Sequence, residues 1–300
     1  MRHQLLFRFL DKVARTGSIR RAAEELAITP SALNRRILSL EAELGEELFE
    51  RHATGVRLNT AGEIFLHHVR GQISDLERVR SQIADLSGMR RGHVDIACTP
   101  ELVRFFMPGQ LQKYRTRYPA VTFSVFQLER GEAELSLIDH TCDIAVVFEP
   151  LKLAEFQTVL SIKQQVYCIM GINHPLAKKD KLRLYECTEY PLMLPHKPRG
   201  VRQVLDAAAA KVNMVLEPVV ESNSLGLLQT LAHGSDALSF TISINIQPLL
   251  EASGFTAVPM DEADVAGGFI FAGHLRGRSL PVAAARFLED ISRELGEKYG

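Results

Sequence analysis

The side chains best equipped for recognition chemistry lie in one short run, TPSALNRRI from Thr29 to Ile37. Thr29-Pro30 predicts a helix start, because the Thr hydroxyl can cap free backbone N–H groups and a proline at the first helical position loses no hydrogen bond. Ser31, Asn34 and Arg35 then share one polar face. The opposite face is an apolar stripe at helical spacing: Leu33, Ile37, Leu40 and Leu44. Because Arg pairs with guanine and Asn with adenine, the polar face favours contact with base edges in the DNA major groove.

A second, shorter helix is expected just before this run. Ser18 is a good N-cap residue, and Ala22, Ala23 and Leu26 follow it at helical spacing as a small apolar face that lets another helix cross closely. Two such helices, the second polar and partly basic, form a helix-turn-helix whose second helix lies in the major groove. On the pattern alone, an αα-hairpin with a solvated outer face explains the same residues.

The residues after the second helix predict a two-stranded hairpin, which strengthens the DNA-binding interpretation. The segment from Leu48 to Leu58 has two short strand-like stretches around the turn-prone sequence HATG. This wing is placed to reach the minor groove or the phosphates, with Arg51 and Arg57 holding the DNA backbone. Residues 1–60 carry 10 Lys or Arg against 8 acids, so affinity must come from the placement of charge. The acids expected to lie away from the DNA or to face a partner are Glu41, Glu43, Glu46, Glu47 and Glu50.

Together these features resemble the N-terminal domain of LysR-type transcriptional regulators. The matching positions are Gly17-Ser18, Ala22-Ala23, Thr29–Ile37, Leu40-Glu41, Leu44-Gly45, Leu48–Arg51 and Leu58–Gly62. The sequence departs from the family at Asn34, where Ser is usual, and at Asn59, where Thr is usual. The resemblance implies a winged helix-turn-helix over residues 1–59. The residues expected to contact DNA are Ser18, Arg20, Thr29, Pro30, Ser31, Asn34, Arg35, Arg51 and Arg57.

A long helix is predicted from Thr60 to Leu86. Thr60 and Glu63 have the spacing of a capping box. An apolar stripe then continues along the segment through Ile64, Phe65, Val69, Ile73, Leu76, Val79, Ile83 and Leu86. A helix of this length, about 40 Å at 1.5 Å per residue, favours a dimer seam over a core helix, since DNA readers of this type bind paired half-sites. Residues 60–87 are therefore interpreted as a dimerisation linker, and residues 88–92 as a hinge.

Beyond the hinge, the pattern alternates between strands and helices, which indicates an α/β domain over residues 93–300. Strands are expected at His93–Thr99, Val121–Gln127 and Cys142–Phe148, with helices between them. This order implies a parallel sheet covered on both faces. A second, similar unit is expected from Gln165. The family resemblance implies two lobes like those of a periplasmic binding protein, joined by two crossover strands, with lobe one at 93–162 plus 268–300 and lobe two at 163–267.

A small-molecule site is expected between the two lobes, because ligands of open α/β sheets lie at the carboxyl ends of strands, near helix N-termini. The residues predicted to border it, partly by the family resemblance, are Thr99, Pro100, Gln127, Phe148, His196, Arg199, Arg202, Ser222, Asn223 and Ser224. The helix starts and the cations of the 196–202 loop favour a small organic anion, such as a carboxylate. An ordinary solvated surface turn is the competing interpretation of that loop.

Other classes of function find little support. The sequence has no P-loop, GxGxxG, GxSxG or HExxH motif, and its ten His residues are scattered, so no enzyme, cofactor or metal site is expected. Four widely spaced cysteines, Cys98, Cys142, Cys168 and Cys187, favour reduced buried thiols over a disulfide framework. No signal peptide or apolar run of membrane length is present, so a cytoplasmic protein is expected.

These observations predict a multidomain protein with a winged helix-turn-helix, a long linker helix and a two-lobed α/β effector domain. Its expected function is sequence-specific DNA binding controlled by a small-molecule effector. The expected partners are promoter DNA, the effector and further copies of the chain, as a dimer or by family resemblance a tetramer, with RNA polymerase as a further candidate. The alternative is a solute-binding module or an enzyme on the same α/β fold with an added helical head.

Overall fold

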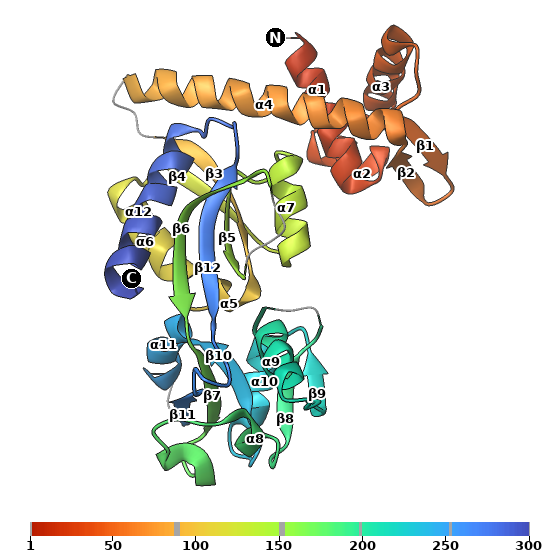
Figure 1. Ribbon diagram of the computed structural model, residues 1–300. Coiled ribbons are helices and arrows are strands. Elements are labelled where there is room, and N and C mark those ends of the chain that lie inside the picture. The colour runs from red at the N-terminus through yellow and green to blue at the C-terminus, as the bar shows by residue number, and fades with distance from the viewer. Residues whose placement is uncertain (1, 87–90, 150–153, 198–199, 252–253, 300) are drawn as a thin grey trace. The chain divides into compact units, whose positions relative to one another are not determined.

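A computed structural model describes residues 2–86, 91–149, 154–197, 200–251 and 254–299 (Figure 1). The chain divides into two compact units, Met1–Met89 with Ile138–Thr141, and Arg90–Leu137 with Cys142–Gly300. Most of the predicted hinge at 88–92 lies outside the described residues.

The first unit is a helical cluster with a small two-stranded wing. Its elements are α1 (Arg2–Thr16), α2 (Ile19–Glu25), α3 (Pro30–Leu44), β1 (Phe49–His52), β2 (Gly55–Leu58) and α4 (Thr60–Leu86). The predicted stripe of α3 is in the core at Leu33, Ile37 and Leu40, whereas Leu44 at the end of the helix is exposed. The antiparallel pair β1–β2 confirms the predicted hairpin. The helix start at Thr29-Pro30 is also confirmed, because the Thr29 side chain accepts a hydrogen bond from the backbone N–H of Ala32.

The start of α4 differs from the predicted capping box of Thr60 and Glu63. The Asn59 side chain caps the helix instead, accepting a bond from the Gly62 N–H at 2.8 Å and donating one to the Glu47 carbonyl at 2.7 Å. Asn59 therefore joins the helix start to the segment before the wing. The first half of α4, including Leu66 and Val69, packs into the helical core.

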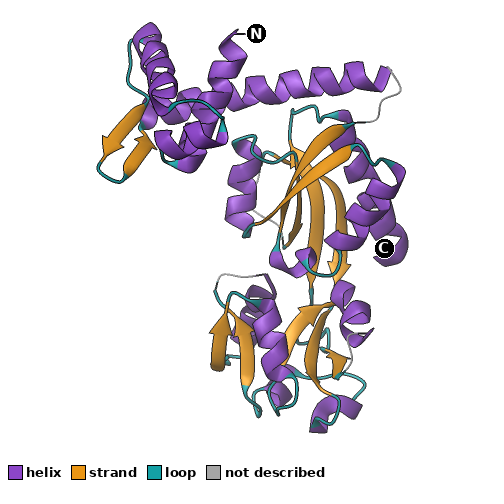
Figure 2. Cartoon of the chain, turned by 180° about the vertical axis from the view of Figure 1, so that it is seen from behind, coloured by secondary structure: helices purple, strands orange, loops and turns teal. Residues whose placement is uncertain are grey.

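The first lobe of the second unit is built on a five-stranded sheet of order β4-β3-β5-β12-β6. Its strands are β3 (Gly92–Cys98), β4 (Val121–Gln127), β5 (Ile144–Phe148), β6 (Phe156–Gln164) and β12 (Gly268–Leu275). Its helices are α5 (Pro100–Val103), α6 (Met107–Arg117), α7 (Arg130–Ile138) and α12 (Val282–Tyr299). Helices α6 and α12 cover one face and α7 the other (Figure 2).

The parallel sheet predicted for the first three strands of this lobe is confirmed. Strands β3, β4 and β5 are parallel, but β12 runs antiparallel to both β5 and β6. The antiparallel strands arise because the chain leaves the lobe along β6 and returns along β12 (Figure 1). Strand β6 was not predicted as a separate element.

The second lobe contains two small sheets rather than a copy of the first. Strands β7 (Val166–Gly171), β10 (Ser239–Ile242) and β11 (Phe255–Pro259) form an antiparallel sheet, and β8 (Leu192–Pro195) pairs in parallel with β9 (Pro218–Ser222). The helical elements are η1 (Pro175–Lys178), α8 (Leu184–Cys187), α9 (Gly200–Lys211), α10 (Leu225–Ala232), η2 (Ser243–Asn245) and α11 (Ile246–Glu251).

The crossover between the lobes is stabilised by a buried glutamine. The fully buried Gln164 is the last residue of β6, with one residue between it and β7, and its side-chain oxygen accepts bonds from the Ser243 hydroxyl and the Ile244 N–H. This satisfied polar group fixes the crossover against η2, since an unpaired amide here would be costly. Within the described residues, no helix is long and apolar enough to span a membrane.

Candidate DNA-binding and effector sites

The polar face of α3 is open to solvent. Thr29, Pro30, Ser31 and Arg35 are all exposed. The Thr29 hydroxyl lies 3.3 Å from that of Ser31, so the first turn presents two hydroxyls to solvent. Among the described residues, Arg35 has no ion-pair or side-chain hydrogen-bond partner, and its charge is available to another molecule.

The wing and the second helix are joined by a hydrogen bond between two predicted DNA-binding residues. The Arg51 guanidinium on β1 donates to the side-chain oxygen of Asn34 on α3 at 3.1 Å. This bond fixes the Arg51 side chain beside the helix and leaves the amide nitrogen of Asn34 as a donor. Arg57 on β2 is exposed. The departure from the family at Asn34 therefore has a structural role.

Glu41 has a role that sequence reasoning missed. It is only 7% exposed, and its carboxylate accepts bonds from the backbone N–H groups of Leu48 at 2.8 Å and Phe49 at 3.2 Å. Glu41 therefore differs from its neighbouring acids in having a structural role within the unit. Its charge holds the start of the wing against α3, because a carboxylate forms stronger bonds to N–H groups than a neutral acceptor.

Other polar residues of the helical unit differ in whether their side chains are free to contact DNA. Ser18 caps α2 by accepting a bond from the Arg21 N–H. Arg20 forms a very exposed ion pair with Glu24 at 3.2 Å, which a competing phosphate can readily replace. Arg36 turns back toward α1, where its guanidinium carbon lies 5.0 Å from the centre of the Phe9 ring. Arg35 and Arg36 are therefore not equivalent.

The effector-site residues predicted in lobe one lie where this lobe meets lobe two, and most of them stabilise the fold. The Thr99 hydroxyl accepts the backbone N–H of Phe148 at 3.0 Å, and Pro100 starts α5. Phe148 is fully buried. Its ring lies against two glycines, so close that a Cβ atom would come within 2.5 Å of the ring at either Gly200, in lobe two, or Gly268. Gln127 is exposed at the end of the edge strand β4.

On the lobe-two side, Arg202 is already neutralised. It is 2% exposed and bonds the carboxylates of Asp206 at 2.8 Å and Glu221 at 2.6 Å, as well as the Pro195 carbonyl. It holds the β8–β9 pair to α9 rather than presenting a free charge. Arg199 lies outside the described residues.

The helix start at α10 agrees with the sequence prediction. Ser224 caps α10 by accepting the Leu227 N–H, and the Ser222 hydroxyl accepts the Ser224 N–H at 3.0 Å, with Asn223 between them. His196 is exposed in the loop after β8, and its Nδ1 lies 2.8 Å from the Lys197 carbonyl oxygen. The exposed ends of this loop and of α10 remain open to a ligand.

Two arginines that were not predicted reach from lobe one to lobe two. Arg104 donates to the Gln229 side-chain oxygen at 2.8 Å, and Arg130 contacts the Gln203 side-chain oxygen. In both contacts the lobe-two partner is a neutral amide. A guanidinium bonds a carboxylate more strongly than an amide. The signal that could have found Arg104 is its position just after the helix that follows β3, at the carboxyl edge of the sheet.

Burial raises the pKa of several side chains in the α/β domain. Burial raises the pKa of the Glu149 carboxyl, although a backbone bond from Phe269 and the nearby Arg130 partly oppose the shift. Burial also raises the pKa of the Cys98 and Cys168 thiols, which keeps them protonated and unreactive. In the described part of the chain, no group of three or more His, Cys, Asp or Glu could hold a metal ion.

The architecture is that of a winged helix-turn-helix protein with a two-lobed α/β domain, and comparison with known proteins identifies the family. Residues 5–63 match the family model "Bacterial regulatory helix-turn-helix protein, lysR family", and residues 87–296 match "LysR substrate binding domain". The chain therefore belongs to the LysR family, and it is a DNA-binding transcriptional regulator with an effector-binding domain. This family consists of transcriptional regulators.

Individual relatives are distant. The uncharacterised HTH-type transcriptional regulator YbhD of Escherichia coli K12 is 26% identical over 221 residues, which cover 72% of this chain and 70% of YbhD. A full-length OxyR variant from Pseudomonas aeruginosa superposes with a TM-score of 0.77 at 17% identity, covering 97% of this chain and 94% of OxyR. Full-length CbnR, solved in complex with its target DNA, gives a TM-score of 0.65 at 18% identity, covering 97% of this chain and 99% of CbnR. These structures share the fold.

Proposed function

We propose that this regulator reads its operator with the α3 face centred on Arg35 and holds the DNA backbone with Arg51 and Arg57. The observation that carries the proposal is the exposed Arg35, which has no ion-pair partner among the described residues, next to an Asn34 that is fixed by Arg51 at 3.1 Å. The other residues that we propose contact DNA are Ser18, Arg20, Thr29, Pro30 and Ser31. Because phosphate contacts release counterions, Arg51 and Arg57 supply the salt-dependent part of the affinity.

The test is selection from randomised duplex DNA, followed by affinity measurements on the enriched sequence. Arg35→Ala should cost about 1–3 kcal/mol of binding and relax the preference at one base pair of each half-site, if Arg35 bonds a guanine. Arg15→Ala is the matched control, because Arg15 is paired with Asp11 on α1 and is not among the residues proposed to contact DNA. An equal loss on all sequences would assign Arg35 to the phosphates instead. Failure to enrich any motif would refute sequence-specific reading.

We further propose that α4 forms a dimer seam. Ile64 and Val79 expose 70% and 40% of their surface, and Ile83 exposes 59%, so the helix carries apolar residues that its own unit does not cover. A second copy of the chain would bury them, and paired half-sites would follow. Replacing Val79 with Lys should lower the mass seen by sedimentation at micromolar concentration. We also propose that residues 1–59 form the DNA-binding domain, 60–87 the dimerisation linker, 88–92 a hinge and 93–300 the effector-binding domain.

For the effector, we propose a small organic anion bound between the lobes by Arg104 and Arg130. Both guanidinium groups already cross to lobe two, where Arg104 bonds the amide of Gln229 and Arg130 that of Gln203. A ligand carboxylate would replace a guanidinium–amide bond with a stronger charge-assisted one. The starts of α9 and α10 add backbone donors on the other side.

Thermal-shift titration with pairs of carboxylates and their amides tests the effector class. Carboxylates should stabilise the protein, and both Arg104→Gln and Arg130→Gln should weaken the effect by about tenfold or more in Kd, since a charge-assisted bond contributes roughly 1.5–3 kcal/mol. Arg276→Gln, which removes an exposed cation from the turn after β12, should leave it unchanged. Stabilisation by amides or amines alone would contradict the anion assignment.

A further inference from the structure

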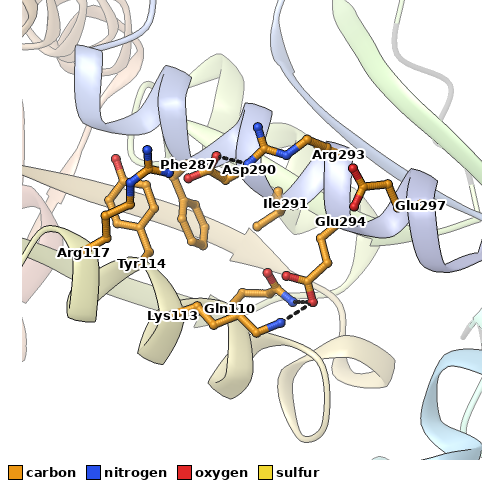
Figure 3. Close-up of a pocket in the computed structure, with 10 residues that line it drawn as sticks. All are labelled: Gln110, Lys113, Tyr114, Arg117, Phe287, Asp290, Ile291, Arg293, Glu294 and Glu297. Carbon is orange, nitrogen blue, oxygen red and sulfur yellow. Dashed lines mark hydrogen bonds and ion pairs between the residues drawn. The ribbon is translucent and has the colours of Figure 1, made fainter.

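The groove of about 270 Å³ between α6 and α12 offers little to a ligand (Figure 3). Lys113 pairs with Glu294 across the two helices at 2.6 Å, and Tyr114, Phe287 and Ile291 beneath them are 5%, 1% and 0% exposed. No apolar surface is therefore left for a ligand to cover. The interlobe end of lobe one is different, because a carboxylate there has an oxygen that the described part of the chain does not use.

This carboxylate belongs to Glu149, which directly follows β5 and has a backbone conformation that is uncommon for glutamate. Its φ angle is +65°, in the left-handed region. Its backbone N–H donates to the Phe269 carbonyl, and its side-chain Oε1 accepts the Phe269 N–H, both at 2.7 Å. These bonds to a single residue of β12 fix the direction of the carboxylate. Residues held in strained backbone conformations are concentrated at ligand sites, so the outlier favours a functional role.

The second oxygen of Glu149, Oε2, accepts no hydrogen bond from any described residue, and the side chain is half-buried. Burial raises the pKa of this carboxyl, and the nearby Arg130 opposes the shift. The Arg130 guanidinium nevertheless forms no direct ion pair with Glu149 and contacts the Gln203 amide of lobe two instead. An anion and a cation thus lie near each other at the interlobe contact without neutralising each other directly.

We propose that the effector is an α-amino acid and that Glu149 binds its ammonium group. This inference rests on the proposed anion site, since the ligand carboxylate bonds Arg130. In an α-amino acid a single carbon atom separates the two charged groups, so neighbouring side chains of opposite charge can bind both. A carboxylic acid without the amino group brings a second negative charge close to Glu149, and this repulsion selects against it. Glu149 is therefore a specificity-determining residue of the cleft.

Isothermal titration calorimetry of the full-length protein tests the proposal with the standard L-amino acids, each compared with the carboxylic acid that lacks its amino group. At least one amino acid should bind about tenfold or more tightly than its deaminated partner, since the bond to Glu149 is charge-assisted. Glu149→Gln should weaken binding of that amino acid by a similar factor and leave the deaminated acid unchanged or bound more tightly. The Gln side chain still accepts the Phe269 N–H, so the contact with β12 is kept. Glu289→Gln, which removes an exposed carboxylate from α12, should change neither affinity.

Proton exchange provides a second readout that a purely structural role would not affect. Because burial raises the pKa of Glu149, this carboxyl is partly protonated in mildly acidic solution, and an incoming ammonium group favours its ionised form. Binding of the amino acid at about pH 5 should therefore release protons, measured as a dependence of the binding heat on the ionisation heat of the buffer. The release should disappear in Glu149→Gln.

The outcomes separate this inference from the anion site on which it rests. Equal binding of amino acids and their deaminated partners, both weakened by Arg130→Gln, would overturn the amino-acid assignment and leave the anion site standing. The absence of binding heat with every amino acid at millimolar concentration would also overturn it, and the anion site would then be decided by its own carboxylate titration. An equal loss of both ligand types in Glu149→Gln, without proton release in the wild type, would leave Glu149 with a structural role alone.

Discussion

Replacing Gly200 with Ala should weaken the contact between the two lobes. Gly200 begins α9 in lobe two, and a Cβ atom there would lie 2.5 Å from Cδ1 and 3.2 Å from Cε1 of Phe148 in lobe one. Ordinary carbon–carbon contacts are about 3.5–4.0 Å, so the new methyl group is too close by roughly 1 Å. The ring cannot simply move away, because it is fully buried and its other side lies against Gly268.

The expected cost is about 1–3 kcal/mol, the usual penalty for one extra methyl group in a packed core. The added methyl group destabilises only the conformation in which the two lobes are in contact. The population of this conformation, relative to one with the lobes apart, should therefore drop by a factor of roughly 5 to 150. Hydrogen exchange should then be faster at the interlobe segments, around residues 101–105 and 200–203. The denaturation midpoint of the α/β domain should fall as well.

Gly109→Ala provides the matched control. Gly109 lies in α6, and a Cβ atom added there would have no neighbour within 4 Å, so Ala should be neutral or slightly stabilising through its higher helix propensity. Combining Gly200→Ala with Phe148→Leu should recover part of the lost interlobe protection, because the smaller side chain leaves room for the methyl group. If Gly200→Ala exchanged and unfolded like Gly109→Ala, the steric argument would be refuted.

Two further predictions concern buried or half-buried carboxylates. Glu41→Gln should destabilise the winged unit by about 1–3 kcal/mol in thermal unfolding, because the charged acceptor of the Leu48 and Phe49 N–H groups is lost, whereas the exposed Glu43→Gln should have little effect. For Glu149, burial raises the pKa in the folded state, so the folded protein binds this proton more tightly than the unfolded chain, and stability should fall as the pH rises through the raised pKa. Relative to Glu149→Gln, the wild-type free energy of unfolding should therefore decrease from about pH 4 to pH 7, and a flat difference would contradict this reasoning.

The elements that the sequence predicted well are those whose signals are local. The start of α3 follows from Thr29-Pro30 and its core face from a stripe with helical spacing, and both are set within a few residues. Strand β6 was missed because it is an edge strand whose first residues are mostly exposed, and it is positioned by β12, which lies about a hundred residues further along the chain. The mixed direction of the lobe-one sheet has the same origin.

The candidate sites were predicted less well than the helices and strands, because the type of a charged residue does not show which side chain pairs with it. Arg202 and Arg104 are both arginines near the start of a helix in the sequence. In the structure, Arg202 is buried between two carboxylates, whereas Arg104 bonds a neutral amide. Part of this was visible, since Asp206 stands at i+4 from Arg202 and such a spacing favours an internal ion pair. The bond between Arg202 and Glu221 joins separate elements and needed the fold.

Phe148 shows how a correctly located residue can have a different role. It was predicted to border the effector pocket from its position at the end of β5, and it does lie at the interlobe contact. Its ring, however, is enclosed by the backbones of Gly200, from lobe two, and Gly268, from the returning crossover strand. Because both neighbours lack a Cβ atom, the ring fills a space that exists only while the lobes touch. An effector that changes the lobe arrangement must therefore displace either this ring or the start of α9, and this makes the Phe148–Gly200 contact a physical link between the cleft and the relative position of the lobes.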